Sequence, residues 1–346
     1  MTDINCHSEM TAFHSEEVTF SRKMQIEMHG RRESGRTRLA NGLDRNSHPQ
    51  PTLVHSQGSY MMRTMVQDAE YDYDIDDGAY FKQADLVDSD GKELTPLAAR
   101  ERVCDALQQD ERLKHPANVR NNCVRQDYPE GYHIDVPVYR IITTKDENGG
   151  VDEYYELASG NEWVKSDARA VTAWFNKEVG LLNAGESDGS QMRRLTKFTK
   201  KFARRNAWKK KTTSGICITK LVFDHFVTAE DRDDKALRQT WISIKKTLDV
   251  STEIQHPIND NNLANDRDPD VMFFLKCLSD ALKTLNILDT AECTRNQALE
   301  AWDEVFDTCF FTNQPDNTKS EKAENSAMSL TSIETARRVD GGGRFG

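Results

Sequence analysis

The sequence lacks any apolar run long enough to cross a membrane. Its 346 residues are 37% hydrophobic and 30% charged, and one of the longest apolar stretches covers only residues 271–275. A transmembrane helix needs about 20 consecutive apolar residues, so we expect no membrane association. The N-terminus is polar and has no apolar core typical of a signal peptide. We therefore expect a protein of the cytoplasm rather than a secreted one.

Paired cysteines are also lacking. The seven cysteines are odd in number, lie far apart and form no C-x-x-C pair; they are Cys6, Cys104, Cys123, Cys217, Cys277, Cys293 and Cys309. A structural zinc site uses closely spaced ligands, and a disulfide framework uses an even set of cysteines. Neither is expected here, and free thiols fit a reducing compartment.

The sequence has no excess of positive charge, since its formal net charge is −11. A stable nucleic-acid partner is therefore not expected, because such proteins neutralise phosphates with lysine and arginine. The charges are nevertheless unevenly distributed. Six of the ten residues 68–77 are acidic, whereas ten of the nineteen residues 193–211 are basic and none is acidic. An acidic strand and a basic helix could bind the same polyanion, the first through a metal ion and the second directly.

The acidic stretch has the alternation of a strand, which would place Asp72, Asp74 and Asp76 on one face. Carboxylates this close repel one another, so a bound divalent cation explains the pattern better than a structural role. Mg²⁺ fits, because it prefers oxygen ligands and commonly binds one or two carboxylates together with substrate phosphates. A calcium loop is excluded, because it needs Gly and Glu at the positions that hold Asp77 and Gln83. An acidic, solvated edge strand is the alternative.

Two further elements would complete a site for nucleotidyl transfer. Upstream, Gly58 lets the backbone approach a phosphate closely, and Ser59 can cap a short helix whose N–H groups face an anion. Downstream, Asp135 lies in a strand among apolar residues, where it is either a turn-edge residue or the third carboxylate of a two-metal site. Two metal ions about 3.5–4 Å apart would activate an attacking hydroxyl and stabilise the leaving pyrophosphate.

The basic stretch and the residues after it are weaker candidates. A lysine-rich helix face is usually solvated, and we expect only one or two of its side chains to reach a triphosphate. Residues 212–215, Thr-Thr-Ser-Gly, could supply a hydroxyl or an N–H group to a nucleotide at the start of the next helix.

The order of the predicted elements indicates an α+β fold with two lobes. Strands and hairpin turns dominate up to about residue 165, and helices are expected between residues 167 and 306. We expect a catalytic lobe with a mixed sheet and an N-terminal helix at 1–165, and a helical lobe at 166–311, with the active site in the cleft. Residues 1–14 are expected to be loosely ordered, and the polar residues 312–346 to form a disordered tail.

Several of these motifs together resemble one family. Over roughly residues 50–310 the sequence is similar to the cGAS/DncV-like nucleotidyltransferases of bacterial antiphage (CBASS) systems, and most similar to the cyclic GMP-AMP synthase type. The matching motifs are Gly58-Ser59, Asp74-Ile-Asp-Asp-Gly78, His133-Ile-Asp-Val-Pro-Val-Tyr139, residues 163–167 with Trp174-Phe175, and Arg194–Phe202 followed by Ser214-Gly215.

This resemblance implies a nucleotidyltransferase (polymerase-beta-like) fold and a set of site residues. The implied catalytic metal ligands are Asp74, Asp76 and Asp135, without Asp72, and the implied nucleotide contacts are Gly58, Ser59, Lys200 and Ser214. The implied cofactor is Mg²⁺, as two ions, with Mn²⁺ as an alternative. The implied substrates are ATP and GTP.

The resemblance also implies a function. We expect synthesis of a cyclic di- or trinucleotide, with cyclic GMP-AMP as the first choice, from ATP and GTP with release of pyrophosphate. The product would be a defence signal in the bacterial cytoplasm. One alternative is a linear transferase that polyadenylates or AMPylates its acceptor. The other is a catalytically inactive nucleotide or RNA sensor, which the three intact aspartates disfavour.

The last residues of the sequence carry a separate expectation. The chain ends in Gly-Gly-Gly-Arg-Phe-Gly, after a segment too polar to fold on its own. The resemblance implies that an E1/E2-like protein of the ubiquitin-conjugation type joins Gly346 to a target. A featureless tail is the alternative.

Overall fold

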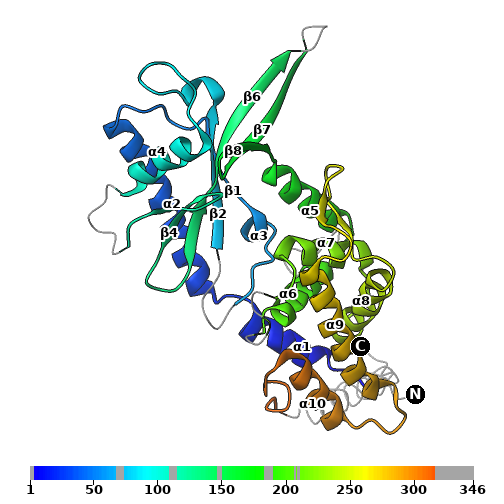
Figure 1. Cartoon of the computed structure of the whole chain (residues 1–346). Coiled ribbons are helices and arrows are strands. Elements are labelled where there is room, and N and C mark those ends of the chain that lie inside the picture. Colours follow the sequence, from blue (N-terminus) through cyan, green and yellow to red (C-terminus); the bar gives the residue numbers. More distant parts are fainter. Residues whose placement is uncertain are drawn as a thin grey trace, which may run out of the picture.

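The computed structural model consists of a sheet-containing lobe and a helical lobe (Figure 1). It describes residues 4–67, 74–108, 115–145, 150–182, 190–205, 208 and 211–315. The short helix α3 (Gly58–Met61) lies where the two lobes meet and contacts both the sheet and the first helix of the helical lobe.

Strand β2 (Asp74–Lys82) is the central strand of the sheet. On one edge it pairs antiparallel with β1 (Leu53–Gln57). On the other edge it pairs in parallel with β5 (His133–Val136) and then with β6 (Val138–Lys145). Pro137, which has no N–H to donate, separates β5 from β6. The strand with the acidic cluster is thus enclosed by neighbours on both edges.

The remaining strands extend this sheet, and two helices cover one of its faces. Strands β3 (Asn118–Val119), β4 (Val124–Asp127), β7 (Val151–Ser159) and β8 (Glu162–Lys165) give the order β3-β4-β5-β2-β6-β7-β8. Helices α2 (Arg22–Arg45) and α4 (Pro96–Gln108) share a buried core with Ile75 and Phe81 of β2. Strands β6 and β7 continue as a hairpin that projects from the lobe (Figure 1).

The helices predicted for the second half of the chain are present. They are α5 (Ala168–Leu182), α6 (Gln191–Ala203), α7 (Gly215–His225), α8 (Asp233–Leu248), α9 (Pro269–Thr284) and α10 (Arg295–Phe306). Phe198, Trp241 and Trp302 are fully buried in their shared core. None of the described helices is both long and apolar enough to cross a bilayer.

The N-terminal segment is ordered, and the expectation of loose order is wrong for residues 4–14. Helix α1 (His7–Phe13) buries Met10 and Phe13 in the core of the helical lobe. The ring of Phe13 packs against those of Phe306 and Phe311, with centroids 4.8 and 4.9 Å away. The helix was not predicted, because polar residues separate its apolar positions. Its packing partners lie at the far end of the described chain, so no local pattern indicated them. Helix α2 then leads from the helical lobe into the sheet lobe (Figure 1).

The contact between α2 and α4 yields a stability prediction. At Gly42 of α2, a Cβ atom would overlap the backbone of Ala106 in α4. We expect Gly42→Ala to lower the free energy of unfolding by about 1–3 kcal/mol or more, because overpacking must push the two helices apart. At Gly30 in the same helix, nothing lies within 4 Å of a Cβ. Gly30→Ala should therefore stabilise the protein by about 0.5–1 kcal/mol. Urea denaturation measures both, and equal effects would contradict the close contact.

Candidate active site

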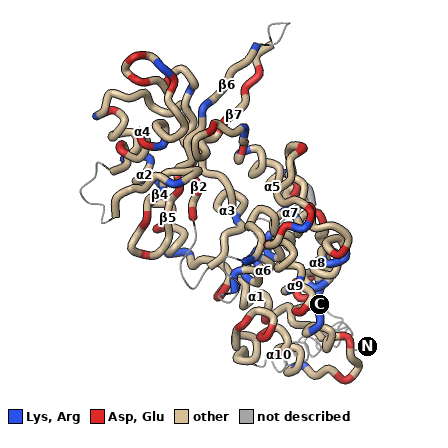
Figure 2. Tube along the Cα trace, in the orientation of Figure 1, with Lys and Arg blue, Asp and Glu red and all other residues tan. Residues whose placement is uncertain are grey.

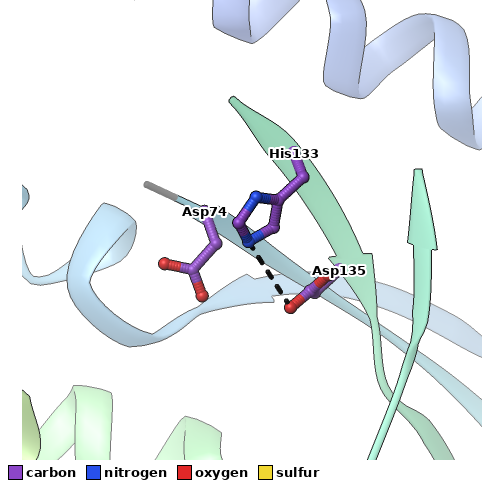
Figure 3. Close-up of side chains that lie close together, drawn as sticks. All are labelled: Asp74, His133 and Asp135. Carbon is purple, nitrogen blue, oxygen red and sulfur yellow. Dashed lines mark ion pairs between the residues drawn. The ribbon is translucent and has the colours of Figure 1, made fainter. Parts of the chain in front are cut away.

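The parallel pairing of β2 with β5 brings acidic residues from two distant segments together. Asp74 pairs with His133, and Asp76 pairs with Asp135. Carboxylate oxygens of Asp74 and Asp135 and a ring nitrogen of His133 lie within 4.8 Å of one another (Figure 3). His133 and Asp135 are buried, and Asp74 is half-buried. Among the described residues, this is the one such cluster compact enough to hold a metal ion.

Asp76 lies beside this cluster and faces the turn at Gly58. Its Oδ2 atom is 2.5 Å from the position that a Cβ of Gly58 would occupy. Asp76 is half-buried. This burial, followed by the negative charges of Asp74 and Asp135, raises the pKa of its carboxyl well above the usual value. A divalent cation would offset this repulsion, and the carboxylate oxygens are donors that suit Mg²⁺ or Mn²⁺. The site can therefore hold a divalent metal ion.

An arginine holds the carboxylate of Asp135. Arg125 of β4 is its cross-strand neighbour, and Nε and Nη2 of Arg125 donate to Oδ1 and Oδ2 at 2.8 and 2.7 Å. The hydrogen bonds to Asp135 raise the pKa of Arg125. On the other side, Nε2 of His133 lies 3.9 Å from Oδ2. A bidentate ion pair uses oxygen lone pairs that a metal ion would need, so Arg125 and a metal ion compete for Asp135.

The predicted phosphate-binding turn lies directly against the carboxylates. Gln57, the last residue of β1, pairs with Asp76, and Gly58 and Ser59 begin helix α3 immediately after it. Gly58 has φ +64°, a left-handed conformation in which glycine avoids the strain of a side chain. Its N–H donates to Oγ1 of Thr172 in α5 at 3.1 Å. The helical lobe therefore orients the turn that faces the sheet lobe's carboxylates.

Two side chains of the helical lobe hold the end of α3. Asn176 of α5 donates from Nδ2 to the carbonyl of Met61 at 3.2 Å. Arg193 of α6 donates from Nε to the carbonyl of Met62 at 3.2 Å and from Nη2 to Oδ1 of Asn176 at 3.0 Å. Both ends of α3 are thus fastened to the helical lobe.

Lys200 comes from α6 at the same junction. Its side chain is buried, and Nζ donates to Oγ1 of Thr64 at 2.9 Å. Nζ lies 3.9 Å from the position of a Cβ on Gly215, the first residue of α7, whose preceding residue Ser214 caps that helix. Burial lowers the pKa of Lys200 to about 7, although the negative charge of Asp74 acts in the opposite direction. Figure 2 shows basic residues gathered around α6 and acidic residues at the facing ends of β2 and β5.

The structure places all the described candidates from the sequence around one junction. Gly58, Ser59 and the aspartates come from the sheet lobe and α3, whereas Lys200 and Ser214 come from the helical lobe. The predicted roles of these residues stay predictions. Asp72 and Gly346 lie outside the described residues.

Sequence reasoning missed several residues of the site, among them His133, Arg125 and Thr172. His133 stands two positions before Asp135 in the same strand and therefore shares its face, a signal that was available. Arg125 and Thr172 gave no such signal. Arg125 depends on the register of β4 against β5, and Thr172 depends on how the two lobes pack.

Comparisons with known proteins bear on the family and on the fold. Residues 52–139 match the sequence family described as the cyclic GMP-AMP synthase DncV-like nucleotidyltransferase domain. CdnC of E. coli MS115-1, solved with ATP, is similar with a TM-score of 0.65 and 13% identity, over 89% of this chain and 99% of that chain. Vibrio cholerae DncV, a cyclic AMP-GMP synthase, is similar with a TM-score of 0.65 and 16% identity, over 87% and 96% of the two chains. The predicted fold class is confirmed.

Two more solved structures of these relatives bear on ligands and partners. Vibrio cholerae DncV in complex with the linear intermediate 5′ pppA(3′,5′)pG has a TM-score of 0.66 and 16% identity, over 87% of this chain and 96% of that chain. The complex of CdnC with HORMA-deltaN has a TM-score of 0.64 and 14% identity, over 89% and 98%. The resemblance to DncV-like nucleotidyltransferases stated from the sequence is confirmed, and residues 52–139 are the part that matches the nucleotidyltransferase domain of that family.

The contact between Gly58 and Asp76 yields a prediction on metal affinity. In Gly58→Ala the new Cβ would collide with Oδ2 of Asp76 and displace the carboxylate. We expect Mn²⁺ affinity, measured by electron paramagnetic resonance titration, to fall about tenfold. Gly91 is the matched control, since it also has positive φ (+77°) but nothing within 4 Å of its Cβ position. Gly91→Ala should lose similar stability and keep Mn²⁺ affinity, and an equal loss of affinity in both variants would contradict the prediction.

The buried ammonium of Lys200 yields a prediction on pH. Its pKa is about 7 in the folded protein against an ordinary 10.5, so the unfolded chain binds more protons between these values. Unfolding free energy should therefore rise between pH 7 and 10.5, by at most about 1.4 kcal/mol per pH unit from this group, and the group should contribute no slope below pH 7. Lys200→Met should remove this slope in urea denaturation at pH 7 and 9. The exposed Lys211, as Lys211→Met, should leave it unchanged.

Proposed function

Because the chain carries a DncV-like nucleotidyltransferase domain over residues 52–139, we propose that it is a cyclic oligonucleotide synthase. It joins ATP and GTP into a cyclic di- or trinucleotide and releases pyrophosphate at each linkage. Cyclic GMP-AMP is the favoured product, and antiphage signalling in bacteria is the favoured role. The observation that carries the proposal is the pairing of Asp74 and Asp76 with His133 and Asp135, directly beside the Gly58 turn.

The chemistry of this chain's side chains supports transfer to a nucleotide rather than mere binding. Asp74, Asp76 and Asp135 would hold two Mg²⁺ ions, which in such sites activate the attacking hydroxyl and stabilise the leaving group. Lys200 places its amine near the start of α7, where helix N–H groups also favour an anion and a bound phosphate would favour the protonated amine. Gly58 lets the backbone and the following Ser59 approach a phosphate beside the carboxylates.

The ligands of the structural neighbours support the choice of substrates. Vibrio cholerae DncV is a cyclic AMP-GMP synthase solved with a linear pppA(3′,5′)pG intermediate, and CdnC is solved with ATP. A linear intermediate is what a single site would form when it joins two nucleotides in succession. The shared fold, together with this chain's own carboxylates beside the Gly58 turn, makes ATP and GTP the first substrates to test here.

Two other functions use the same residues. A linear transferase, polyadenylating or AMPylating, needs the same carboxylates, and product analysis distinguishes it from a cyclase. An inactive nucleotide or RNA sensor is disfavoured, because a site that only binds polyanions has little reason to gather carboxylates whose charges repel one another.

A protein partner is a further part of the proposal. CdnC is solved in complex with HORMA-deltaN, so a protein that docks on this chain and changes its activity is one candidate class. An E1/E2-like protein that conjugates Gly346 is the other. The second stays a prediction, since residues 316–346 lie outside the described part of the chain.

The wild-type chain, incubated with all four nucleoside triphosphates and Mg²⁺ or Mn²⁺, should form a phosphatase-resistant product whose mass is that of a cyclic nucleotide. Asp76→Asn should reduce this product at least about a hundredfold, because the site loses a metal ligand. The same change should raise thermal stability, because it removes one of the mutually repelling charges.

The exposed Asp152 of β7, as Asp152→Asn, is the matched control and should change neither activity nor stability. Wild-type rates from a folded Asp76→Asn variant would disprove the catalytic assignment. A phosphatase-sensitive product of the wild type would instead identify a linear transferase.

A further inference from the structure

A partly buried ion pair lies on the face of β2 opposite to the carboxylate cluster. Asp77 follows Asp76 in the strand, so its side chain points to the other face, which α2 covers. Nε and Nη2 of Arg36 in α2 donate to its Oδ2 and Oδ1 at 2.7 and 2.6 Å. Asp77 is only 3% exposed, so water and salt reach its carboxylate little, whereas the side chain of Arg36 is 29% exposed.

A serine of the neighbouring strand belongs to the same cluster. Ser56 of β1 is the register partner of Asp77, and its hydroxyl donates to Oδ1 at 2.7 Å. The hydroxyl oxygen accepts from Nη1 of Arg32 at 3.0 Å and from Nη2 of Arg36 at 3.2 Å. The carboxylate of Asp77 therefore accepts three hydrogen bonds from two different elements. A bidentate guanidinium sets the direction of a carboxylate as well as balancing its charge.

The same helix contacts the phosphate-binding turn. The guanidinium of Arg32 lies 5.3 Å from the ring centroid of Tyr60 in α3, within the range of a cation–π interaction. Ser56, which Arg32 also contacts, is separated from Gly58 only by Gln57. Through Arg32 and Arg36, one face of α2 is thus fastened to both segments that meet in the active site, β2 and the connection from β1 to α3.

We propose that Arg36 is a positioning residue for the active site, which through Asp77 and Ser56 sets β2 against β1 so that Asp76 faces Gly58 at the required spacing. That spacing leaves little tolerance, since a Cβ on Gly58 would lie 2.5 Å from Oδ2 of Asp76. Arg36 also balances the charge of an additional carboxylate in a strand that already carries Asp74 and Asp76. The inference rests on the proposed function only for the role of these carboxylates in binding metal.

The test compares two arginines of the same sheet lobe. Arg36→Lys keeps the positive charge and loses the two-pronged geometry toward Asp77. Arg140 of β6 is the control, because its Nε donates to Glu156 at 2.6 Å in a cross-strand pair away from the carboxylates. Mn²⁺ affinity of the full chain without nucleotide is measured by electron paramagnetic resonance, and thermal stability by calorimetry.

We expect Arg36→Lys and Arg140→Lys to lower the melting temperature by similar amounts. Only Arg36→Lys should weaken Mn²⁺ binding, by about ten- to a hundredfold, as the loss of a group that orients a metal ligand typically does. In the double variant Arg36→Lys, Asp77→Glu, the longer carboxylate side chain compensates for the shorter basic one. This variant should recover part of the Mn²⁺ affinity. Should Arg36→Lys fail to fold, Asp77→Asn removes the ion pair at nearly constant shape and should weaken Mn²⁺ binding in the same way.

The outcomes separate this inference from the proposed function. Wild-type Mn²⁺ affinity in a folded Arg36→Lys or Asp77→Asn variant would overturn the inference and leave the cluster with a structural role alone. No Mn²⁺ binding by the wild-type chain would overturn both. A chain that binds Mn²⁺ and responds to Arg36→Lys, but forms no cyclic product, would overturn the proposed function and uphold the role of Arg36.

Discussion

The parallel pairing of β2 with β5 holds like charges together that would otherwise separate, and the rest of the site depends on it. Backbone hydrogen bonds set Asp74 opposite His133 and Asp76 opposite Asp135, whatever the side chains prefer. The cost is visible at Asp76, whose pKa is raised by burial and by the charges of Asp74 and Asp135. A strand with this composition would not stay buried on its own propensity. It is central because β1 encloses one edge and β5 and β6 the other.

Two arginines form ion pairs with aspartates on opposite faces of the sheet, and the two ion pairs differ in whether a metal ion would disturb them. Arg125 lies on the face of the carboxylate cluster and donates to both oxygens of Asp135, so a metal ion would compete with it for that carboxylate. Arg36 lies behind the strand and binds Asp77, which no ligand of the site would contest. A metal ion at Asp135 would weaken the first pair, whereas it would leave the second intact. This difference is why only the second is suited to maintain the geometry of β2.

The junction of the lobes completes what the sheet begins. Helix α3 begins at the turn predicted to bind phosphate, and Thr172, Asn176 and Arg193 of the helical lobe fix its two ends. Lys200 enters from the same lobe and is held by Thr64, which follows that turn. A shift between the lobes would therefore move the turn and the lysine together relative to the carboxylates. Each lobe therefore positions one half of the same candidate site.

The sequence by itself determined which residues could carry the chemistry. Alternation placed Asp74 and Asp76 on one face, and Gly58 marked a turn, because these inferences need only local backbone geometry. The helices after residue 167 were also predictable, since their periodicity is local. The tertiary structure alone decided which distant residues meet. Strand register joined Asp135 to Arg125, lobe packing joined Thr172 to Gly58, and a core built from the far end of the chain ordered Phe13. Such contacts depend on the pairing of segments remote in sequence, and no local pattern encodes that pairing.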